Sequence, residues 1–342
     1  MAFMQRRWTL LWQPDEAQLI AALPSLPPEQ VRRGPIVLAT DQPARQTVDG
    51  KAVGVLDGVV FNDRQLAEPL AGRGAPVVDQ QDLALHAVGW SGLSGLGAMR
   101  WHGTLAVLHQ AQRTAIVARD WQGVGGLHWA PVGHGQLFAN TAAAFLAFGV
   151  RPQLVPPGML AMCAPSGVQW QVIPSQPEVR AWFRDLPEEL AHPTPEHWQA
   201  GLMARLEDAV RACQRSLTCI ARDTPTDAAG SWLVQHLPLP PTATPKGIWT
   251  LAGANAWLGL AAVEPLEPQS GPWPAPEPSE PLRVDDHVAR ARRVRATWLP
   301  DLALETARLD AEKRNLQLVA PHLDPAVLAW LGAMPRALRP LA

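Results

Sequence analysis

Apolar runs in the first half of the chain predict a β-rich domain. Branched and aromatic side chains favour extended structure, and five runs of them are predicted strands: residues 8–12, 53–61, 105–108, 115–118 and 127–130. The last three follow one another at short intervals with turn residues between them, which is typical of an antiparallel meander. Two segments have helical composition, residues 82–88 and 141–148. A layer of strands carrying a few helices is therefore predicted for residues 1–170.

The pattern changes to a helical period in the second half of the chain. Apolar residues recur at every fourth position from Trp198 to Val210, and Pro195 stands where the first turn of a helix tolerates proline. Residues 285–296 and 303–314 are also predicted to be helices.

A proline-rich segment interrupts this second half. Residues 264–282 contain seven prolines, which lack the amide hydrogen that helices and central strands need, so this segment is predicted to be a loop. The change of pattern along the chain predicts two domains, residues 1–170 and residues 190–342, with the loop inside the second.

Charge balance and cysteine content exclude several classes of protein. The 342 residues include 29 Lys+Arg and 31 Asp+Glu, a formal net charge of −2, which excludes a nucleic-acid binder that relies on bulk positive charge. The three cysteines have no CxxC or zinc-ligand spacing, so neither a disulfide framework nor a metal site is predicted. The first apolar run stops at Pro14, too short for a signal sequence, and no stretch reaches the ~18 apolar residues of a membrane-spanning helix. We expect a cytoplasmic protein without membrane insertion, metal or cofactor.

The tryptophan content suggests a partner. Only 18% of the residues are charged, against roughly 25% in ordinary soluble domains, whereas the chain has 15 tryptophans and no tyrosine. Because interface cores are enriched in tryptophan and depleted of charge, this composition predicts a partly covered surface and a stable homo-oligomer or complex.

The residues taken alone show no evident catalytic site. Glycine-rich residues 89–97 and 123–126 fit neither a nucleophile elbow nor a phosphate-binding loop, and both are predicted to be turns. The acidic residues Asp285 and Asp286 follow the proline-rich loop, where an acidic helix start is favoured.

Four motifs of the first half occur in the order found in asparagine synthetases. Residues 117–130 resemble the family's ARDRxGxxPLYYA signature, and residues 137–146 resemble its LFASELKALL. Upstream, residues 33–35 resemble RGPD, and residues 54–66 resemble NGEIYNxxEL. The resemblance implies a class II glutamine amidotransferase-like domain, an Ntn-hydrolase-like α+β fold in which two antiparallel sheets lie between helices.

The second half resembles the same family more distantly. Residues 206–210 resemble the helix before the family's nucleotide loop, and residues 246–259 lie where VVLTGEGADELFGG is expected. Residues 298–302 and 319–324 resemble LPxxLL and RVPFLD. This implies a truncated synthetase domain, a mainly helical α/β remnant.

The amidotransferase motifs lack the residues that perform the chemistry. The family's nucleophile is a cysteine exposed after removal of the initiator methionine, and its own α-amine helps to activate it; Ala2 stands at that position. The Asn-Gly pair that stabilises the oxyanion is Asp57-Gly58 here, and a carboxylate repels a developing oxyanion. The glutamate that recognises the glutamine amine corresponds to Val59. The resemblance therefore implies a vestigial glutamine site with no catalytic residue.

The nucleotide motifs are altered as well. The family's SGGxDS loop uses glycines so that backbone amides can approach pyrophosphate; here Pro225 removes an amide hydrogen, Asp223 adds negative charge, and only Asp227 is retained. In the second acidic motif, Asn255 and Ala256 replace the acids that would hold Mg²⁺. A vestigial nucleotide loop is implied.

Three functions remain open at this point. The first is a degenerate asparagine synthetase-like protein that acts as a structural or regulatory partner of an amide-forming synthetase or of itself. The second is an ATP-dependent amide ligase without glutaminase activity. The third is a small-molecule binding module that uses the vacated amidotransferase cleft. Trp249 and Trp257 flank the altered acidic motif and either fill the former nucleotide space or belong to an ordinary core.

Overall fold

The chain divides into two compact units. In the computed structural model these are residues 1–174 with 270–274, and residues 175–269 with 275–342. The structure describes the following residues: 7–41, 44–75, 78–174, 194–217, 220–222, 228–237, 247–251, 271–272, 304–314 and 316–334.

Two six-stranded antiparallel sheets build the first unit. The first sheet has the order β10-β8-β9-β1-β3-β2, and its strands are β1 (Trp8–Trp12), β2 (Glu29–Arg33), β3 (Ile36–Thr40), β8 (His128–Val132), β9 (Gly135–Ala139) and β10 (Gln153–Leu154). The second sheet has the order β12-β11-β7-β6-β5-β4, and its strands are β4 (Arg45–Gln46), β5 (Ala52–Val60), β6 (Trp101–His109), β7 (Thr114–Arg119), β11 (Met159–Ala164) and β12 (Gly167–Val172).

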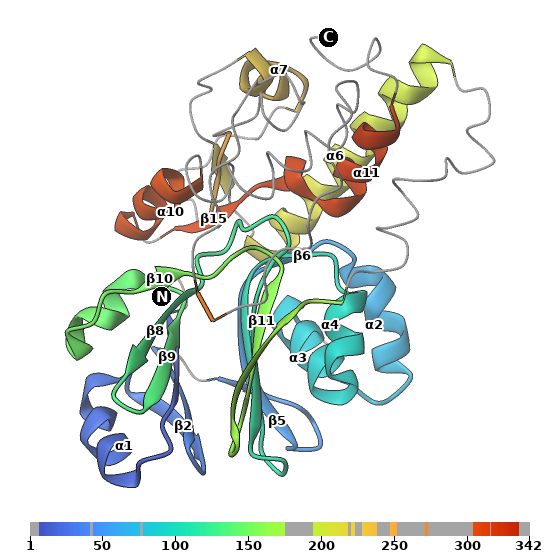
Figure 1. Ribbon diagram of the computed structural model, residues 1–342. Coiled ribbons are helices and arrows are strands. Elements are labelled where there is room, and N and C mark those ends of the chain that lie inside the picture. Colours follow the sequence, from blue (N-terminus) through green and yellow to red (C-terminus); the bar gives the residue numbers. More distant parts are fainter. Residues whose placement is uncertain are drawn as a thin grey trace, which may run out of the picture. The chain divides into compact units, whose positions relative to one another are not determined.

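The two sheets pack face to face, and helices cover both outer faces (Figure 1). The outer face of the first sheet carries α1 (Glu16–Ala22) and the 3₁₀ helices η1 (Leu23–Ser25) and η2 (Ala142–Phe148), whereas the second carries α2 (Asp63–Ala71), α3 (Gln80–Ser91) and α4 (Leu93–Ala98). Side chains along β5 point alternately to the two faces of the second sheet, so both faces are apolar and both are covered. Val53 and Val55 pack in the core between the sheets, while Leu56 and Val60 pack against the helices.

Both tryptophans of β1 bond to the opposite sheet. The Trp8 indole Nε1 donates to the Thr104 hydroxyl of β6 at 3.3 Å, and the Trp12 indole Nε1 donates to the Ala164 carbonyl of β11 at 2.7 Å. A buried indole needs such a partner for its N–H. The two sheets are therefore linked by hydrogen bonds at both ends of β1.

The second unit contains a small parallel sheet. Strands β13 (Ile220–Arg222), β14 (Gly247–Trp249) and β15 (Gln317–Val319) form it in that order, and the described helices are α6 (Pro195–Leu217), α7 (Ala228–His236), α10 (Leu304–Lys313), η5 (Pro321–Leu323) and α11 (Pro325–Ala333). Helix α6 buries the predicted stripe that includes Trp198, and the Trp330 indole of α11 donates to the Trp198 carbonyl at 2.9 Å.

The predicted arrangement of two antiparallel sheets with helices is confirmed. Residues 141–148 are a 3₁₀ helix from Ala142, not an α-helix. Residues 285–296, and the loop 264–282 except 271–272, lie outside the described residues. That residues 190–342 derive from a synthetase domain stays a prediction.

Most tryptophans in the described part of the chain are buried or half-buried. Only Trp121, with 39% of its surface accessible, is exposed among them. Among these residues the indoles are therefore mostly packed within the two units, and the predicted oligomer or complex stays a prediction. Within the same residues, no helix is both long and apolar enough to cross a bilayer.

Candidate functional site

The segment Asp57–Val59 lies near the end of β5, where side chains from both sheets converge. The Asp57 carboxylate accepts a hydrogen bond from the Asn140 side-chain amide at 2.9 Å. The amide oxygen of Asn140 in turn accepts the backbone N–H of Trp8 at 2.9 Å. One asparagine after β9 thus joins the start of β1 to the carboxylate of the opposite sheet. Sequence reasoning did not single out Asn140, although it lies in the stretch that resembles LFASELKALL.

Three glycines bring the backbone together beside Asp57. Gly58 pairs with Gly103 across the strands β5 and β6. A Cβ atom at Gly58 would overlap the His102 carbonyl oxygen, one at Gly103 would overlap the Asp57 carbonyl oxygen, and one at Gly125 would overlap the Gly103 backbone. Gly103 also has φ +119°, which favours glycine. No side chain fits at these three positions, so the close approach explains the residue type without any catalytic role.

Asp120 organises the loop between β7 and β8. Its carboxylate is fully buried and accepts four backbone N–H groups, those of Gly103 (3.0 Å), Gln122 (3.0 Å), Val124 (3.2 Å) and Gly125 (2.8 Å). The neighbouring Arg119 guanidinium donates to the carbonyls of Gly123, Gly125 and Val155. These amides already bond a carboxylate of the chain itself. Residues 123–126 thus lie in the loop between β7 and β8, as predicted, although the turn itself is at residues 121–122, and this loop is not an open anion cradle.

Side chains of α3 hold both flanks of Asp57–Val59. Strand β4 pairs with β5 only at Val53 and Gly54, so the rest of this edge needs other partners. The Gln81 side-chain amide donates to the Leu56 carbonyl at 3.0 Å, and the Gln80 side-chain oxygen accepts the Val60 N–H at 2.8 Å.

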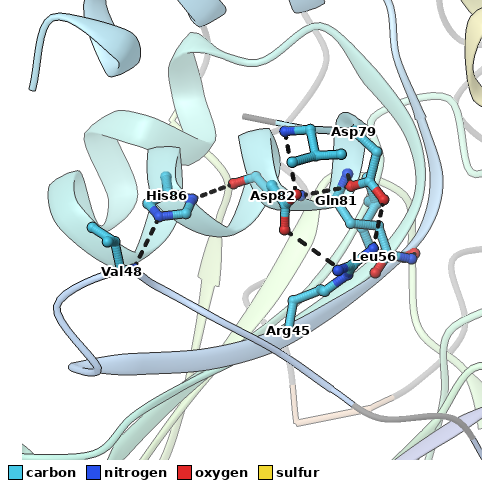
Figure 2. A network of polar contacts seen from close by, with 8 residues as sticks. Arg45, Val48, Leu56, Asp79, Gln81, Asp82 and His86 are labelled. Carbon is cyan, nitrogen blue, oxygen red and sulfur yellow. Dashed lines mark hydrogen bonds and ion pairs between the residues drawn. The ribbon is translucent and has the colours of Figure 1, made fainter. Parts of the chain in front are cut away.

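A wider polar network fixes α3 itself against the β4–β5 hairpin (Figure 2). Asp79 caps the helix by accepting the N–H groups of Gln81 and Asp82, and it forms an ion pair with Arg45 at 2.9 Å. Further along, His86 Nε2 accepts the Val48 N–H at 3.2 Å, and its Nδ1 lies 2.6 Å from the Asp82 carbonyl. The ring is therefore a donor at Nδ1 and an acceptor at Nε2. These bonds hold α3, and with it Gln80 and Gln81, in place beside β5.

The described cysteines are not nucleophiles. Cys163 of β11 lies in the core between the sheets, and Cys213 is buried in α6. Burial raises the pKa of both thiols well above the usual range, so neither forms a thiolate near neutral pH. Ala2 lies outside the described residues. Val59 is described and is only 1% exposed, so an apolar side chain fills the position matched to the family's glutamate.

Most of the predicted nucleotide site cannot be placed. Asp223, Pro225, Asp227, Asn255, Ala256 and Trp257 all lie outside the described residues. Trp249 is described: it is fully buried, and its indole N–H donates to His322 Nδ1 at 3.2 Å. That Trp249 fills the former nucleotide space stays a prediction. In the part of the chain that the structure covers, no group of three or more His, Cys, Asp or Glu side chains could hold a metal ion.

A comparison with protein families gives one match. Residues 36–147 match the family described as "Glutamine amidotransferase domain". The first unit contains a glutamine amidotransferase-like domain. The amidotransferase part of the resemblance is thus confirmed, whereas the asparagine synthetase part stays a prediction. The match covers β3 to η2 and includes Asp57, Asp120 and Asn140.

Solved structures show more distant similarity to this chain. The glutamine phosphoribosylpyrophosphate amidotransferase from B. subtilis, complexed with ADP and GMP, is 13% identical with a TM-score of 0.39, over 63% of this chain and 60% of its own. A second structure, described as the allosteric regulatory enzyme of purine biosynthesis, is 12% identical with a TM-score of 0.38, over 69% and 58%. A glutamine aminotransferase class-II domain protein from Silicibacter pomeroyi is 12% identical with a TM-score of 0.31, over 50% and 92%. The chain spans about three fifths of the first two proteins. No curated protein matches it.

Proposed function

We propose that this chain is a catalytically degenerate, asparagine synthetase-like protein that acts as a structural or regulatory partner, either of an amide-forming synthetase or of a second copy of itself. The observation that carries the proposal is the bond between Asp57 and Asn140. Amide hydrolysis through a tetrahedral intermediate needs hydrogen-bond donors aimed at the oxyanion. A carboxylate only accepts hydrogen bonds, and this one already accepts the side-chain amide of Asn140.

The surroundings of Asp57 support the same proposal. Val59 offers no charge for a substrate ammonium group, and Ala2 stands at the position matched to the nucleophile. The Trp8 indole bonds to Thr104, the cross-strand partner of Asp57, and packs in the core between the sheets. Framework residues such as Gly103 and Asp120 are retained, while the residues that would act on glutamine are replaced.

The first prediction is an absence of glutaminase activity that one substitution does not repair. We expect purified protein to release ammonia from glutamine at the rate of buffer alone. The variant Ala2→Cys should also stay at that level, because Asp57 and Val59 still oppose oxyanion and substrate binding. A coupled glutamate dehydrogenase assay measures the ammonia, with an active class II amidotransferase as positive control.

Two results would contradict the proposal. One is ammonia release that follows the purified protein and rises on Ala2→Cys. The other is a micromolar ATP–Mg²⁺ site in calorimetry that is lost on Asp227→Ala, which would instead support the ligase hypothesis.

A further inference from the structure

The four sheet edges of the first unit are not protected equally. Sheet edges in natural proteins are usually blunted by short strands, charges or proline, because an open edge pairs with other chains. The edge strands β4 and β10 are each two residues long, and β2 carries Glu29, Arg32 and Arg33. Strand β12 is six residues long, Gly-Val-Gln-Trp-Gln-Val, with no charge and no proline. Among the described residues, it is the edge best suited to pairing.

The phase of the β11–β12 ladder shows which groups point outward. The Ile173 N–H bonds to the Gly158 carbonyl at 2.8 Å, just beyond the last pair of the ladder. Because bonded and non-bonded pairs alternate in an antiparallel ladder, Gln169 and Gln171 direct their backbone groups toward β11. Val168, Trp170 and Val172 direct theirs away from it. Within the described part of the chain, β11 is the only strand that pairs with β12.

The sequence of β12 is its own mirror image from Val168 to Val172. In an antiparallel pair of two such strands centred on Trp170, Trp170 lies opposite its copy, Gln169 opposite Gln171, and Val168 opposite Val172. Val168 and Trp170 already pack against the core between the sheets. Val172 lies on the same side of the sheet and is 50% exposed. The paired strands would place apolar residues together on the core side and glutamines together on the other.

We propose that β12 is an interface with a second copy of this chain, formed by antiparallel β12–β12 pairing about a two-fold axis through Trp170. A self-complementary strand without charge favours the identical partner, and a two-fold axis closes the assembly at a dimer. This interface names the partner in the proposed function as a second copy of the chain. Its meaning as a structural or regulatory contact rests on that function, whereas the pairing itself does not.

Disulfide trapping tests both the interface and its register. Gln169 and the partner's Gln171 form a non-bonded pair, for which the Cα–Cα distance is about 4.5 Å, within the range of a disulfide. We expect Gln169→Cys/Gln171→Cys to form a covalent dimer on mild oxidation, reversed by reductant and seen on non-reducing gels. Each single variant alone should stay unlinked, and a mixture of the two should cross-link. Single variants that cross-link as well as the double variant would overturn the register.

Solution mass tests the interface independently of any cross-link. Light scattering of the full chain at tens of micromolar should give twice the mass of one chain. The variant Val172→Lys adds a charge at the edge and should halve that mass, whereas the control Val78→Lys, at a residue 83% exposed, should not. A monomeric wild-type chain, or a dimer unchanged by Val172→Lys, would overturn the proposal.

The same preparations separate this inference from the proposed function. Glutaminase activity in a dimer would contradict the lack of chemistry and support the interface. A monomer that releases no ammonia would contradict the interface and support the lack of glutaminase chemistry.

Discussion

Replacing Asp120 with alanine should destabilise the first unit by about 4 kcal/mol, since four N–H groups, two of them buried and two half-buried, would each lose their acceptor at roughly 1 kcal/mol. The loop after β7 would lose its shape, because the Gly103 N–H would lose its acceptor and only the backbone bond from residue 120 to the Gly103 carbonyl would remain. Urea unfolding followed by circular dichroism measures the change in the free energy of unfolding.

Asp15→Ala is the matched control, because the Asp15 carboxylate also accepts backbone N–H groups but lies at the protein surface. Asp15 accepts the N–H groups of Ala17 and Gln18 at the start of α1, where water can replace it. Asp15→Ala should cost only about 1 kcal/mol, the usual effect of removing a helix cap. If Asp120→Ala costs no more than this control, then the Asp120 network does not organise the loop.

Gly58→Ala should destabilise the first unit about as much as Asp120→Ala, but for a steric reason. The added methyl group would overlap the His102 backbone carbonyl, which belongs to a central ladder and cannot move without breaking strand pairing. We expect a loss of about 3 kcal/mol or more, at the upper end of overpacking effects. Thermal unfolding should show a lower Tm or an insoluble protein.

Gly72→Ala serves as the comparison for this variant. Gly72 ends α2 with φ −58°, and its added Cβ would lie 3.6 Å from the nearest atom, an ordinary contact. We expect a change below about 0.5 kcal/mol. Equal losses for the two variants would mean that the close approach at Gly58 does not determine stability.

The sequence predicted the elements whose pattern is local. Strand β1 is buried throughout and apolar except for Thr9 because both of its faces are covered, and α6 shows one apolar stripe over 23 residues. Other elements carry no such signal. Helix α2 contains Pro69 and few apolar side chains, and each strand of the parallel sheet has only three residues. Strand β12 does carry a local signal, because apolar and polar residues alternate from Val168 to Val172, and this strand could have been predicted from that period.

The candidate site was predictable only in part. The resemblance located Asp57, Gly58 and Val59, because motif order survives where side chains have changed. The role of Asn140 could not be predicted, since 83 residues separate it from Asp57 and the bond depends on how the two sheets face each other. The bonds from Gln80 and Gln81 to the backbone of β5 could not be predicted either, because they depend on the short length of β4, which leaves that backbone without a strand partner there.

The two indole bonds of β1 have a consequence for motion. The sheets cannot separate at one end while staying packed at the other unless a buried hydrogen bond breaks. We therefore expect the two sheets to open at both ends of β1 together rather than at one end alone. Amide hydrogens of β1 and β5 should then exchange with solvent in the same event.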